Sequence, residues 1–592
     1  MPSPSPTPLS AAIARAKHDR AASAFSPLHP FLPEPDAELH PRQAAQLKLA
    51  HAEAQAWEAE LLRDARGVQR YLGWNYGELC DEARSIPARL RALASLGSRR
   101  EFDPQRLVAI AERVFKIQVP GKTQEAKVAR VLDGRYWRLA LWKRIGQAKE
   151  HLHLKLGLIG KGARAYCSAD ALTVRSTQLK RQQQWLKETV LRADIDGERV
   201  ELPLEAVAKS PRQKLARLYA FIAAMDQLAM ENSLTVTMLT ATLEGPWHAN
   251  PTYAGAGHRW NGKTPGEASK ELGARFQRVR RDLDKKGIAI SGLWAAEPHK
   301  DACPHRHFWL IYAPQHERSV LAAFLGHFPG KLKLRRDAAA GGDVMFDDRA
   351  DALAGRARPL AYEKEGAQVD VVVIDRTKSS GASYALKYVS KAIGAELAFD
   401  GEGDPDDATA PTEKQRELQK TLQAVDAYRS VWRMRSCQFF GIRNSLSLWD
   451  ELRRMKEPPE EMDLRALWRA ARGGDAKGSV SADVQRGDAC AFLKLQGGLA
   501  AAPKAEQREL DDEAPQPQAR VYRTPTLTQY GETGTRIAGV ELVEPGKEEA
   551  VLERVATRQT RWTLAPKEKA KGKGKKPGTS PAKPMAKRRR DS

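Results

Sequence analysis

The sequence has few cysteines and no long apolar run. Five of its 592 residues are cysteine, and no two of them form a C-x-x-C pair, so neither a disulfide framework nor a zinc ribbon is supported. No stretch approaches the roughly 18 consecutive apolar residues of a membrane-spanning helix, and the N-terminus lacks the basic-then-apolar order of a secretory signal. We therefore expect a cytoplasmic protein with reduced cysteines and no membrane partner.

Acidic residues are also fewer than basic ones. The 74 Asp and Glu face 97 Lys and Arg, a formal charge of +23 with an isoelectric point of about 9.7. Residues 567–592 alone hold eleven basic residues against two acidic ones, Glu568 and Asp591, a net +9. Such a surplus favours a polyanionic partner, nucleic acid first. The tail can add sequence-independent affinity for DNA, and a merely solubilising tail is the alternative.

The length implies roughly three to five domains, and composition divides the chain further. Proline, serine and alanine dominate the first 40 residues, and helical spacing of apolar residues follows. Short β-branched or aromatic runs begin near residue 233, and periodicity fades beyond about Pro458. We expect a flexible leader (1–40), a helical N-terminal region (41–164), a helical segment (165–232), a mixed central domain (233–455), a region of unassigned fold (456–566) and a disordered basic tail (567–592).

The central domain alternates predicted strands with predicted helices, which is typical of an α+β fold. The strands are expected at 233–243, 292–298, 307–314, 369–375 and 436–442. The helices are expected at 265–286, 316–326, 382–394 and 413–434. The acidic segment 400–411 is expected to be a solvated loop, and the basic amphipathic segment 175–192 a helix.

The segment EPHKDACPHRHFWLIY is the first candidate for chemistry. Residues i and i+2 of a strand share a face, so His305 and His307 project together while Arg306 points to the other side. Glu297 ends the preceding strand, and a wide hairpin loop can bring its carboxylate beside His305. Two histidines and a carboxylate leave positions open for substrate oxygens. His299 is a rival third ligand.

The segment SSGASYALKYVSKAIG is the second candidate. On a helix, Tyr384, Lys387, Tyr388 and Lys391 fall within about 100° of one another. Two phenols interleaved with two ammonium groups suit attack on a phosphodiester, because positive charge favours the phenolate and attracts phosphate. The simpler interpretation is that the tyrosines pack on a neighbouring element.

The expected ends and core face of this helix can also be stated. The tyrosines are predicted to lie off the core stripe, on the side opposite the apolar residues. Serine favours the N-cap and glycine the C-terminal end. The residues concerned are Leu386, Val389 and Ile393 for the stripe, Ser379 or Ser380 for the cap, and Gly394 for the end.

A third segment, GHRWNGKT (257–264), satisfies the phosphate-loop pattern G-x-x-x-x-G-K-T, with VDVVVID (369–375) as a possible magnesium-binding strand. A phosphate loop leaves a buried strand directly, yet ANPTYAGA precedes this one. The loop carries bulky His258, Arg259 and Trp260, and Pro265 follows where the helix should already run. We expect no ATP site here.

At these residues the sequence resembles the replication gene A protein family, the rolling-circle initiators of tailed phages within the HUH endonuclease superfamily. The resemblance covers roughly residues 165–454 in the family's order. Its motifs are AYCSADAL, MLTATLEGPWHANP, WNGKTP, GLWAAEPHKDACPHRHFWLIYAP, GASYALKYVSK and AYRSVWRMRSCQFFGIRNSLSLWDELRR. It implies an antiparallel, ferredoxin-like or RNA-recognition-like HUH sheet over 233–455, with the histidines on a central strand and the tyrosines on a facing helix.

The resemblance also implies roles. His305 and His307 match the metal-binding pair, Glu297 a third ligand, and Tyr384 and Tyr388 the paired nucleophiles. The histidine motif precedes the tyrosines as in replication initiators, whereas conjugative relaxases place the tyrosine first. One departure is Arg306, because the residue between the histidines is normally hydrophobic or aromatic.

The function expected from this pattern is nicking of one DNA strand at an origin, leaving a 5′-phosphotyrosine link and a free 3′-hydroxyl primer, followed by rejoining. The cofactor is a divalent ion, Mg²⁺ or Mn²⁺, and Lys387 and Lys391 contact phosphate or are ordinary solvated lysines. The implied partners are single-stranded or supercoiled origin DNA and, by the resemblance, a host helicase and polymerase in a bacterium that carries a phage or prophage. The alternatives are a relaxase or transposase of the superfamily, or a non-catalytic basic DNA-binding protein.

Overall fold

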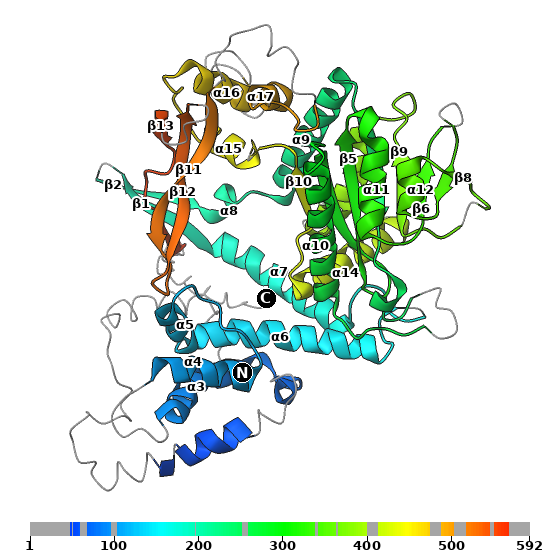
Figure 1. The fold of residues 1–592 in the computed structure, drawn as a ribbon. Helices are drawn as coiled ribbons and strands as arrows, with labels where there is room; N and C mark the ends of the chain where they lie inside the picture. The colour runs from blue at the N-terminus through cyan, green and yellow to red at the C-terminus, as the bar shows by residue number, and fades with distance from the viewer. Residues whose placement is uncertain are drawn as a thin grey trace, which may run out of the picture.

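The computed structural model shows a mixed α+β protein with three sheets (Figure 1). Its sheets are antiparallel apart from one parallel strand pair, as detailed below. The structure describes residues 48–49, 51–59, 68–95, 103–160, 162–195, 197–251, 258–337, 341–362, 365–399, 413–443, 445–473, 487–502, 517–544 and 550–567. The leader, the acidic segment 400–411 and the basic tail beyond Lys567 therefore lie outside the described residues.

The N-terminal helices pack around one aromatic core. Trp137, Phe115 and Tyr71 are fully buried there, and the carboxylate of Glu82 inside this core accepts hydrogen bonds from Trp57 and Tyr71. Asp103, Thr123 and Asp133 cap three of the helices with their side chains, as N-cap residues do. The elements are η1 (Gln69–Tyr71), α3 (Tyr76–Ser95), α4 (Pro104–Phe115), α5 (Gln124–Val131) and α6 (Gly134–Lys155).

The expected helical segment 165–232 is wrong in its middle. Helix α7 (Ala169–Glu188) begins at the cap residue Ser168 but ends at Glu188, so the basic segment 175–192 is helical only in part. The residues that follow form two paired antiparallel strands, stabilised by contacts between the strands that a helical pattern does not show. The elements after α7 are β1 (Thr189–Ile195), β2 (Glu198–Pro203), α8 (Leu204–Val207) and α9 (Pro211–Glu231), and β1 also pairs with β14 (Thr563–Pro566).

The central sheet has eight strands in the order β10-β4-β5-β3-β9-β6-β7-β8. Its first five are the strands expected from the sequence: β3 (Thr235–Ala241), β4 (Ser291–Pro298), β5 (Pro304–Tyr312), β9 (Val369–Val373) and β10 (Cys437–Phe440). The other three were not expected, since β6 (Leu332–Arg335), β7 (Val344–Phe346) and β8 (Arg358–Pro359) are too short for a clear pattern. Pairing is antiparallel except between β6 and β9.

Strand β5 lies between β4 and β3, and both faces of the sheet are covered. Helices α10 (Pro265–Asp284) and α11 (Glu317–His327) pack on one face around Phe276, Phe308 and Phe324. Helices α9 and α13 (Gly381–Phe399) pack on the other, against Met238 and Trp309. The expected helix 413–434 is α14 (Glu413–Trp432), and η2 (Gly245–Trp247), η3 (Pro314–His316) and α12 (Arg349–Ala354) fill the connections.

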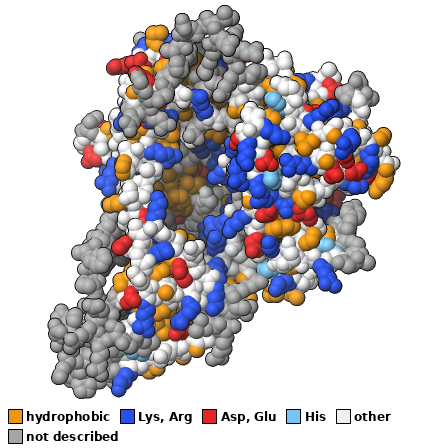
Figure 2. Space-filling model, in the orientation of Figure 1, with side chains coloured by type: hydrophobic (Ala, Val, Ile, Leu, Met, Phe, Trp, Pro, Cys, Tyr) orange, Lys and Arg blue, Asp and Glu red, His pale blue; other side chains and the backbone are white. Residues whose placement is uncertain are grey.

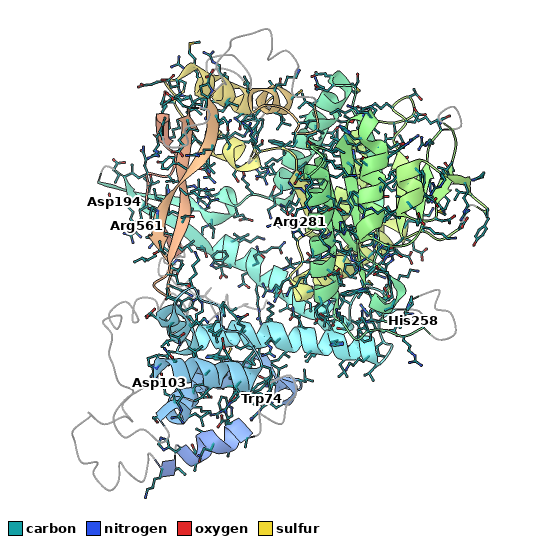
Figure 3. The ribbon with its side chains drawn as sticks, viewed as in Figure 1. Trp74, Asp103, Asp194, His258, Arg281 and Arg561 are labelled. Atoms are coloured by element: carbon teal, nitrogen blue, oxygen red, sulfur yellow. The ribbon has the colours of Figure 1, made fainter. Side chains whose placement is uncertain are left out.

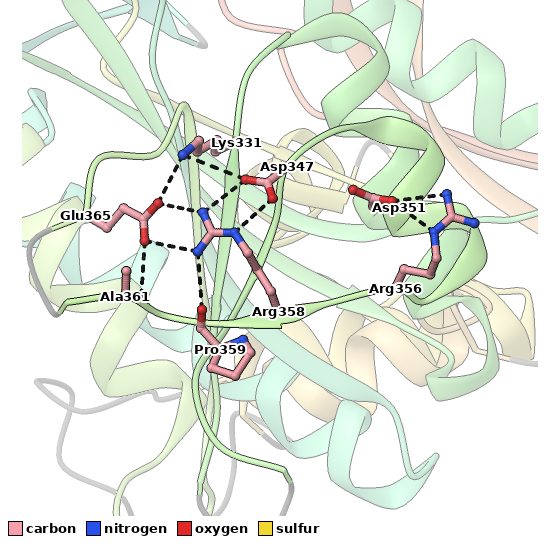
Figure 4. A network of polar contacts seen from close by, with 8 residues as sticks. All are labelled: Lys331, Asp347, Asp351, Arg356, Arg358, Pro359, Ala361 and Glu365. Atoms are coloured by element: carbon pink, nitrogen blue, oxygen red, sulfur yellow. Dashed lines mark hydrogen bonds and ion pairs between the residues drawn. The ribbon is translucent and has the colours of Figure 1, made fainter.

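An ion-pair network fastens the short strands at the far edge of this sheet (Figure 4). The Arg358 guanidinium donates to Asp347 and to Glu365, and the Lys331 ammonium donates to Glu365. These bonds hold the pKa of the Glu365 carboxyl down to about 2, with Arg358 the largest cause. Strand β8 thus depends on charge pairing more than on buried apolar surface.

The region 456–566, whose fold the sequence left unassigned, contains helices and a three-stranded sheet. Beyond α15 (Ser445–Leu452), the elements are α16 (Met462–Arg472), α17 (Ala489–Leu495), β11 (Gln518–Leu527), β12 (Thr533–Val543) and β13 (Val551–Ala556). The β11–β12 hairpin reaches back to the N-terminal helices (Figure 1), where Tyr530 donates to Asp133 and Glu532 pairs with Arg130.

The phosphate-loop pattern has a structural role in the described residues. Residues 258–264 form no strand. Thr264 is the N-cap of α10, where it exchanges hydrogen bonds with Glu267 in a capping box. Lys263 lies over the ring of Trp247 at 4.7 Å. The threonine and lysine that a phosphate loop would direct to a nucleotide are therefore engaged with the protein.

The start of the tyrosine helix α13 is anchored by a buried carboxylate. Asp226 of α9 accepts a hydrogen bond from the Ala382 N–H at 3.0 Å and pairs with Arg376 at 3.0 Å. A side chain at Gly381 would place its Cβ 2.5 Å from this carboxylate, which explains the glycine. Ser380 also caps the helix, as expected, by accepting from the Ser383 N–H.

The expected end of the same helix at Gly394 is wrong, because α13 continues to Phe399. Glycine is tolerated inside a helix at a cost of about 1 kcal/mol relative to alanine.

Among the described residues, no helix is both long and apolar enough to cross a membrane.

We expect Asp226→Ala to loosen α13. The change removes a helix-capping acceptor and leaves Arg376 without its buried partner, a loss of about 2 kcal/mol or more. Amide hydrogen exchange in residues 381–389 should become at least about thirtyfold faster. The control is Glu231→Ala on the same helix, an exposed carboxylate paired with Lys494, which should leave that exchange unchanged. Equal exchange in both variants would contradict the anchoring role.

Candidate metal and nucleophile site

The β4–β5 hairpin and the neighbouring strand β3 align four polar side chains. Glu297 on β4 lies directly opposite His305 on β5, and Thr240 on β3 lies directly opposite His307. Directly opposed residues of antiparallel strands have Cβ atoms about 4.5–5.5 Å apart. The expectation that the hairpin brings the Glu297 carboxylate beside His305 is confirmed.

Three side chains bring their possible ligand atoms within 4.8 Å of one another, and we call them the ligand group: Glu297, His305 and His307. The Nε2 atoms of the two histidines are 2.8 Å apart, and Nε2 of His307 is 3.5 Å from Oε2 of Glu297. In the described part of the chain this is the one group of three or more histidine, cysteine or carboxylate side chains that could share an ion. Nitrogen and oxygen donors converging from two strands fit a divalent cation with open coordination positions.

The ring of His307 is held by its other nitrogen. Thr240 Oγ1 lies 2.9 Å from Nδ1 of His307. When Nδ1–H donates to the hydroxyl, the Nε2 lone pair is directed at the ligand group, which is how outer hydrogen bonds orient metal-binding histidines. The threonine of the MLTAT segment therefore has a role that sequence reasoning did not assign.

His299, the rival ligand, lies beside the group and outside it. Its ring centroid is 4.3 Å from that of His305 and 5.0 Å from that of His248, and His248 in turn pairs with Asp301 at 2.9 Å. Burial, with His248 as a second cause, lowers the pKa of His299 to about 4. His299 is thus a neutral ring that packs against His305.

The two tyrosines reach the site from α13. The Tyr388 ring lies against the His307 ring, with centroids 4.0 Å apart and planes inclined by 30°. Tyr384 lies one turn earlier, and both rings are half-buried against the core on this face of the sheet. The prediction that the tyrosines lie off the core stripe is therefore wrong in part, because they border the core that includes Ala385 and the expected Val389.

The electrostatics of Tyr388 differ from the sequence-based expectation. Burial raises the pKa of the Tyr388 phenol, and the negative charge of Glu297 and of Asp370 raises it further. The Lys387 ammonium is exposed and lies 6.0 Å from the Tyr388 ring centroid. The side chain of Lys391 lies outside the described residues. Within the protein alone, the phenol therefore favours its neutral form.

Arg306 occupies the opposite face of the sheet, as the alternation of the strand predicts. It is buried over the Trp294 ring, with its guanidinium carbon 4.1 Å from the centroid. Burial lowers the pKa of this guanidinium to about 10. An aromatic neighbour thus accommodates the arginine where the family normally has a hydrophobic or aromatic residue.

Two residues near Glu297 were missed by sequence reasoning. Arg429 of α14 is buried, which lowers its pKa, while Asp426 and Glu297 oppose that change. Burial and the charge of Glu297 raise the pKa of Tyr166, whose N–H donates to the Lys300 carbonyl in the β4–β5 loop. The AYCSADAL motif was a signal for Tyr166, whereas a single arginine inside an amphipathic helix gave none for Arg429.

Relatives of the chain are replication proteins of phages and prophages. It is 29% identical over 422 residues to the probable replication protein P12 of Pseudoalteromonas phage PM2, covering 70% of this chain and 57% of that protein. It is 27% identical over 444 residues to the replication gene A protein of Escherichia phage 186, covering 74% of this chain and 56% of that protein. A probable replication endonuclease from a prophage-like region of Salmonella typhi is 23% identical over 463 residues, covering 76% of this chain and 50% of that protein.

The chain thus spans about half the length of these relatives, and no solved structure matches it. The family model described as bacteriophage replication gene A protein (GPA) matches residues 78–396, more than half of the chain. That match includes the hairpin with its histidines and the tyrosine helix. The chain belongs to the bacteriophage replication gene A protein family.

Proposed function

We propose that this protein is a replication initiator that nicks one DNA strand at an origin. The observation that carries the proposal is the stacking of Tyr388 on His307, one of three side chains whose ligating atoms converge. A phenol within reach of an ion site is the arrangement that attack on a phosphodiester needs. Membership of the family and relatives named replication endonucleases support the same reaction.

The residues present fit a divalent cation, which we propose to be Mg²⁺ or Mn²⁺. His305, His307 and Glu297 would hold it, with Thr240 orienting His307. Imidazole donors suit manganese better than magnesium, whereas magnesium keeps more of its waters. When bound, the cation supplies positive charge that polarises the scissile phosphate and orients it for in-line attack.

The nucleophile is the phenol of Tyr388 or of Tyr384. Its oxygen attacks the scissile phosphorus, a P–O(Tyr) bond forms, and the P–O3′ bond breaks. The electron pair of the broken bond stays on O3′, which takes up a proton, while the phenol loses one. The products are a 5′-phosphotyrosine link and a free 3′-hydroxyl.

We propose parts for the remaining residues of α13. Lys387 lies beside Tyr388 and is exposed, so its ammonium can pair with a phosphate and offset the negative charge that raises the pKa of Tyr388. Lys391 follows one turn later and would act in the same way. Two tyrosines at i and i+4 lie on one helix face, so the second can cleave after one round of synthesis.

Because the covalent link is exchanged rather than hydrolysed, rejoining consumes no ATP. The 3′-hydroxyl would prime a host polymerase, and a host helicase would separate the strands inside a bacterium that carries the phage or prophage. The central domain that we propose to hold this chemistry spans residues 233–455 and takes the HUH arrangement, with a sheet of ferredoxin-like type facing the tyrosine helix.

The proposed ion site can be tested by Mn²⁺ titration calorimetry. We expect His307→Ala to weaken Mn²⁺ binding more than the roughly 10- to 100-fold that loss of an outer hydrogen-bonding partner costs. Thr240→Val, which keeps the side-chain shape, should lie within that range. His316→Ala, a histidine at the start of α11, is the control and should bind as wild type does. Unchanged affinity in His307→Ala would refute the site.

The nucleophile can be tested with supercoiled origin DNA in the presence of Mn²⁺. The double variant Tyr384→Phe/Tyr388→Phe removes both attacking oxygens and keeps both rings, so nicking should fall at least about a thousandfold, as for loss of other catalytic nucleophiles. Tyr219→Phe, an exposed tyrosine on α9, should nick normally. Continued nicking and covalent attachment by the double variant would show that another group attacks.

A further inference from the structure

Two cavities border the edge strand β10, and a third lies next to the second, between helices. The first, of about 470 Å³, lies between α9, β10 and the start of α15. The second, of about 260 Å³, lies between α10, the back of β4 and β5, and the segment after α14. The third, of about 360 Å³, lies between α3, α6, α7 and α14. Arg435 lines the first two and Arg433 the last two, so each cavity shares an arginine with the next.

The lining of these cavities is of one charge sign. Among the described residues they are lined by ten lysines and arginines and by no aspartate or glutamate, although 74 of the chain's 592 residues are acidic. The exposed cations are Lys143, Lys270, Arg433, Arg435 and Arg443. Figure 2 shows Lys and Arg side chains gathered over β10 and α10, at the border of the central hollow. Among the ten cations, Arg217 is ion-paired with Asp450 and Arg175 with Asp426. A concave surface with an excess of positive charge attracts and concentrates a polyanion.

Aromatic side chains lie between the cations. Trp74, Tyr76 and Trp142 line the third cavity and are half-buried, and Figure 3 places Trp74 among the N-terminal helices. Trp294 and Trp432 also line the second cavity but are buried, so the faces open to a base are those of the third cavity. Cations that follow a backbone, combined with aromatic faces on which bases stack, are how proteins hold single strands without reading their sequence.

The first cavity lies one strand away from the ligand group on the same face of the sheet, and the second lies on the opposite face, beside Arg306 and Trp294. Cys437 on β10 pairs with Ala295 on β4, and the Ala296 N–H donates to the Ser436 carbonyl at 2.8 Å. Glu297 is the next residue along β4. Helix α14 carries Arg429, and the negative charge of Glu297 acts to raise the pKa of its guanidinium. Arg433 follows directly after the end of this helix. A strand lying along the cavities would therefore pass close to Glu297.

We propose that these cavities form the path of a single DNA strand that runs from the N-terminal helices around β10 to the ligand group. The proposal rests on the proposed function and deepens it by naming where the substrate lies. A single strand fits better than a duplex, because small separate concavities receive unpaired bases, whereas a duplex is read by an element that protrudes into its groove. The N-terminal helices thereby become part of the substrate-binding surface.

The path can be tested by binding of a fluorescein-labelled 30-nucleotide oligothymidylate, followed by anisotropy over a range of salt concentrations. Arg433→Ala/Arg435→Ala should weaken binding on the order of tenfold, and the slope of log affinity against log salt should become less steep by about 1.4, since each lost single-strand phosphate contact removes about 0.7. An unchanged slope in this variant would overturn the path.

The matched control removes the same charge elsewhere. Lys285 and Lys286 are exposed at the C-terminal end of α10, and Lys285 lies about 22 Å along the helix axis from Lys270 at 1.5 Å per residue. Lys285→Ala/Lys286→Ala should keep the wild-type slope. An equal loss of slope in the control would mean that overall charge, not the path, binds the strand, and would also overturn the proposal.

A second measurement does not depend on any variant. Oligonucleotides that carry 5-iododeoxyuridine at successive positions can be photocrosslinked to the wild-type chain and the products located by mass spectrometry. The path predicts crosslinks at Tyr76 and Trp142 for bases far from the nick. Crosslinks confined to β5 and α13 at every position would overturn it.

Failure of the path and failure of the proposed function give different results. Protein that nicks origin DNA but shows no crosslink in the N-terminal helices would contradict the path alone. Protein that crosslinks there and loses salt dependence in Arg433→Ala/Arg435→Ala, yet nicks no DNA, would support the path and contradict the nicking mechanism alone.

Discussion

The register of three adjacent strands is the constraint on which the site depends. Pairing of β4 with β5 sets Glu297 opposite His305, and pairing of β3 with β5 sets Thr240 opposite His307. A slip of one residue would turn both histidines to the face where Arg306 now packs on Trp294, because strand side chains alternate. The apolar residues that follow, Phe308 to Tyr312, are all buried between two helical layers, so such a slip would press side chains fitted to one layer against the other and place Arg306 in the core beside α13. Packing of the strand thus fixes the chemistry at its start.

The second requirement is a rigid placement of α13 over that strand. A glycine at 381 permits the helix start to approach the buried Asp226, and the Tyr388 ring then packs on His307. Close packing raises the pKa of Tyr388 by burial, so a ready nucleophile needs positive charge near the phenol. An ion in the ligand group and a phosphate-bound Lys387 would both act in that direction. In the proposed mechanism, activation of the phenol therefore depends on the presence of the cation and the strand.

The sequence predicted the middle of the molecule better than its ends. Five strands of the central sheet and its helices follow period-2 and period-3.6 patterns, and the ligand group follows from alternation across a hairpin. Sequence patterns failed where contacts with other parts of the chain determine the local structure. Residues 189–203 form strands after a helix, and 462–472 form a helix beyond the point where periodicity seemed to fade. Arg429, Thr240 and the cavities around β10 depend on residues far apart in the chain, and no local pattern reports such proximity.

Part of the chain's excess positive charge lines the proposed path from the N-terminal helices to the ligand group. The site itself depends on a few residues of β4, β5 and α13. The most direct measurement of the central claim is mass spectrometry of the peptide that remains attached to DNA after cleavage of origin DNA with Mn²⁺ and digestion by trypsin and nuclease. We predict a nucleotide 5′-phosphate on one or both of the two peptides that contain Tyr384 and Tyr388. A phosphotyrosine at Tyr166, or cleaved DNA with no attached peptide, would contradict it.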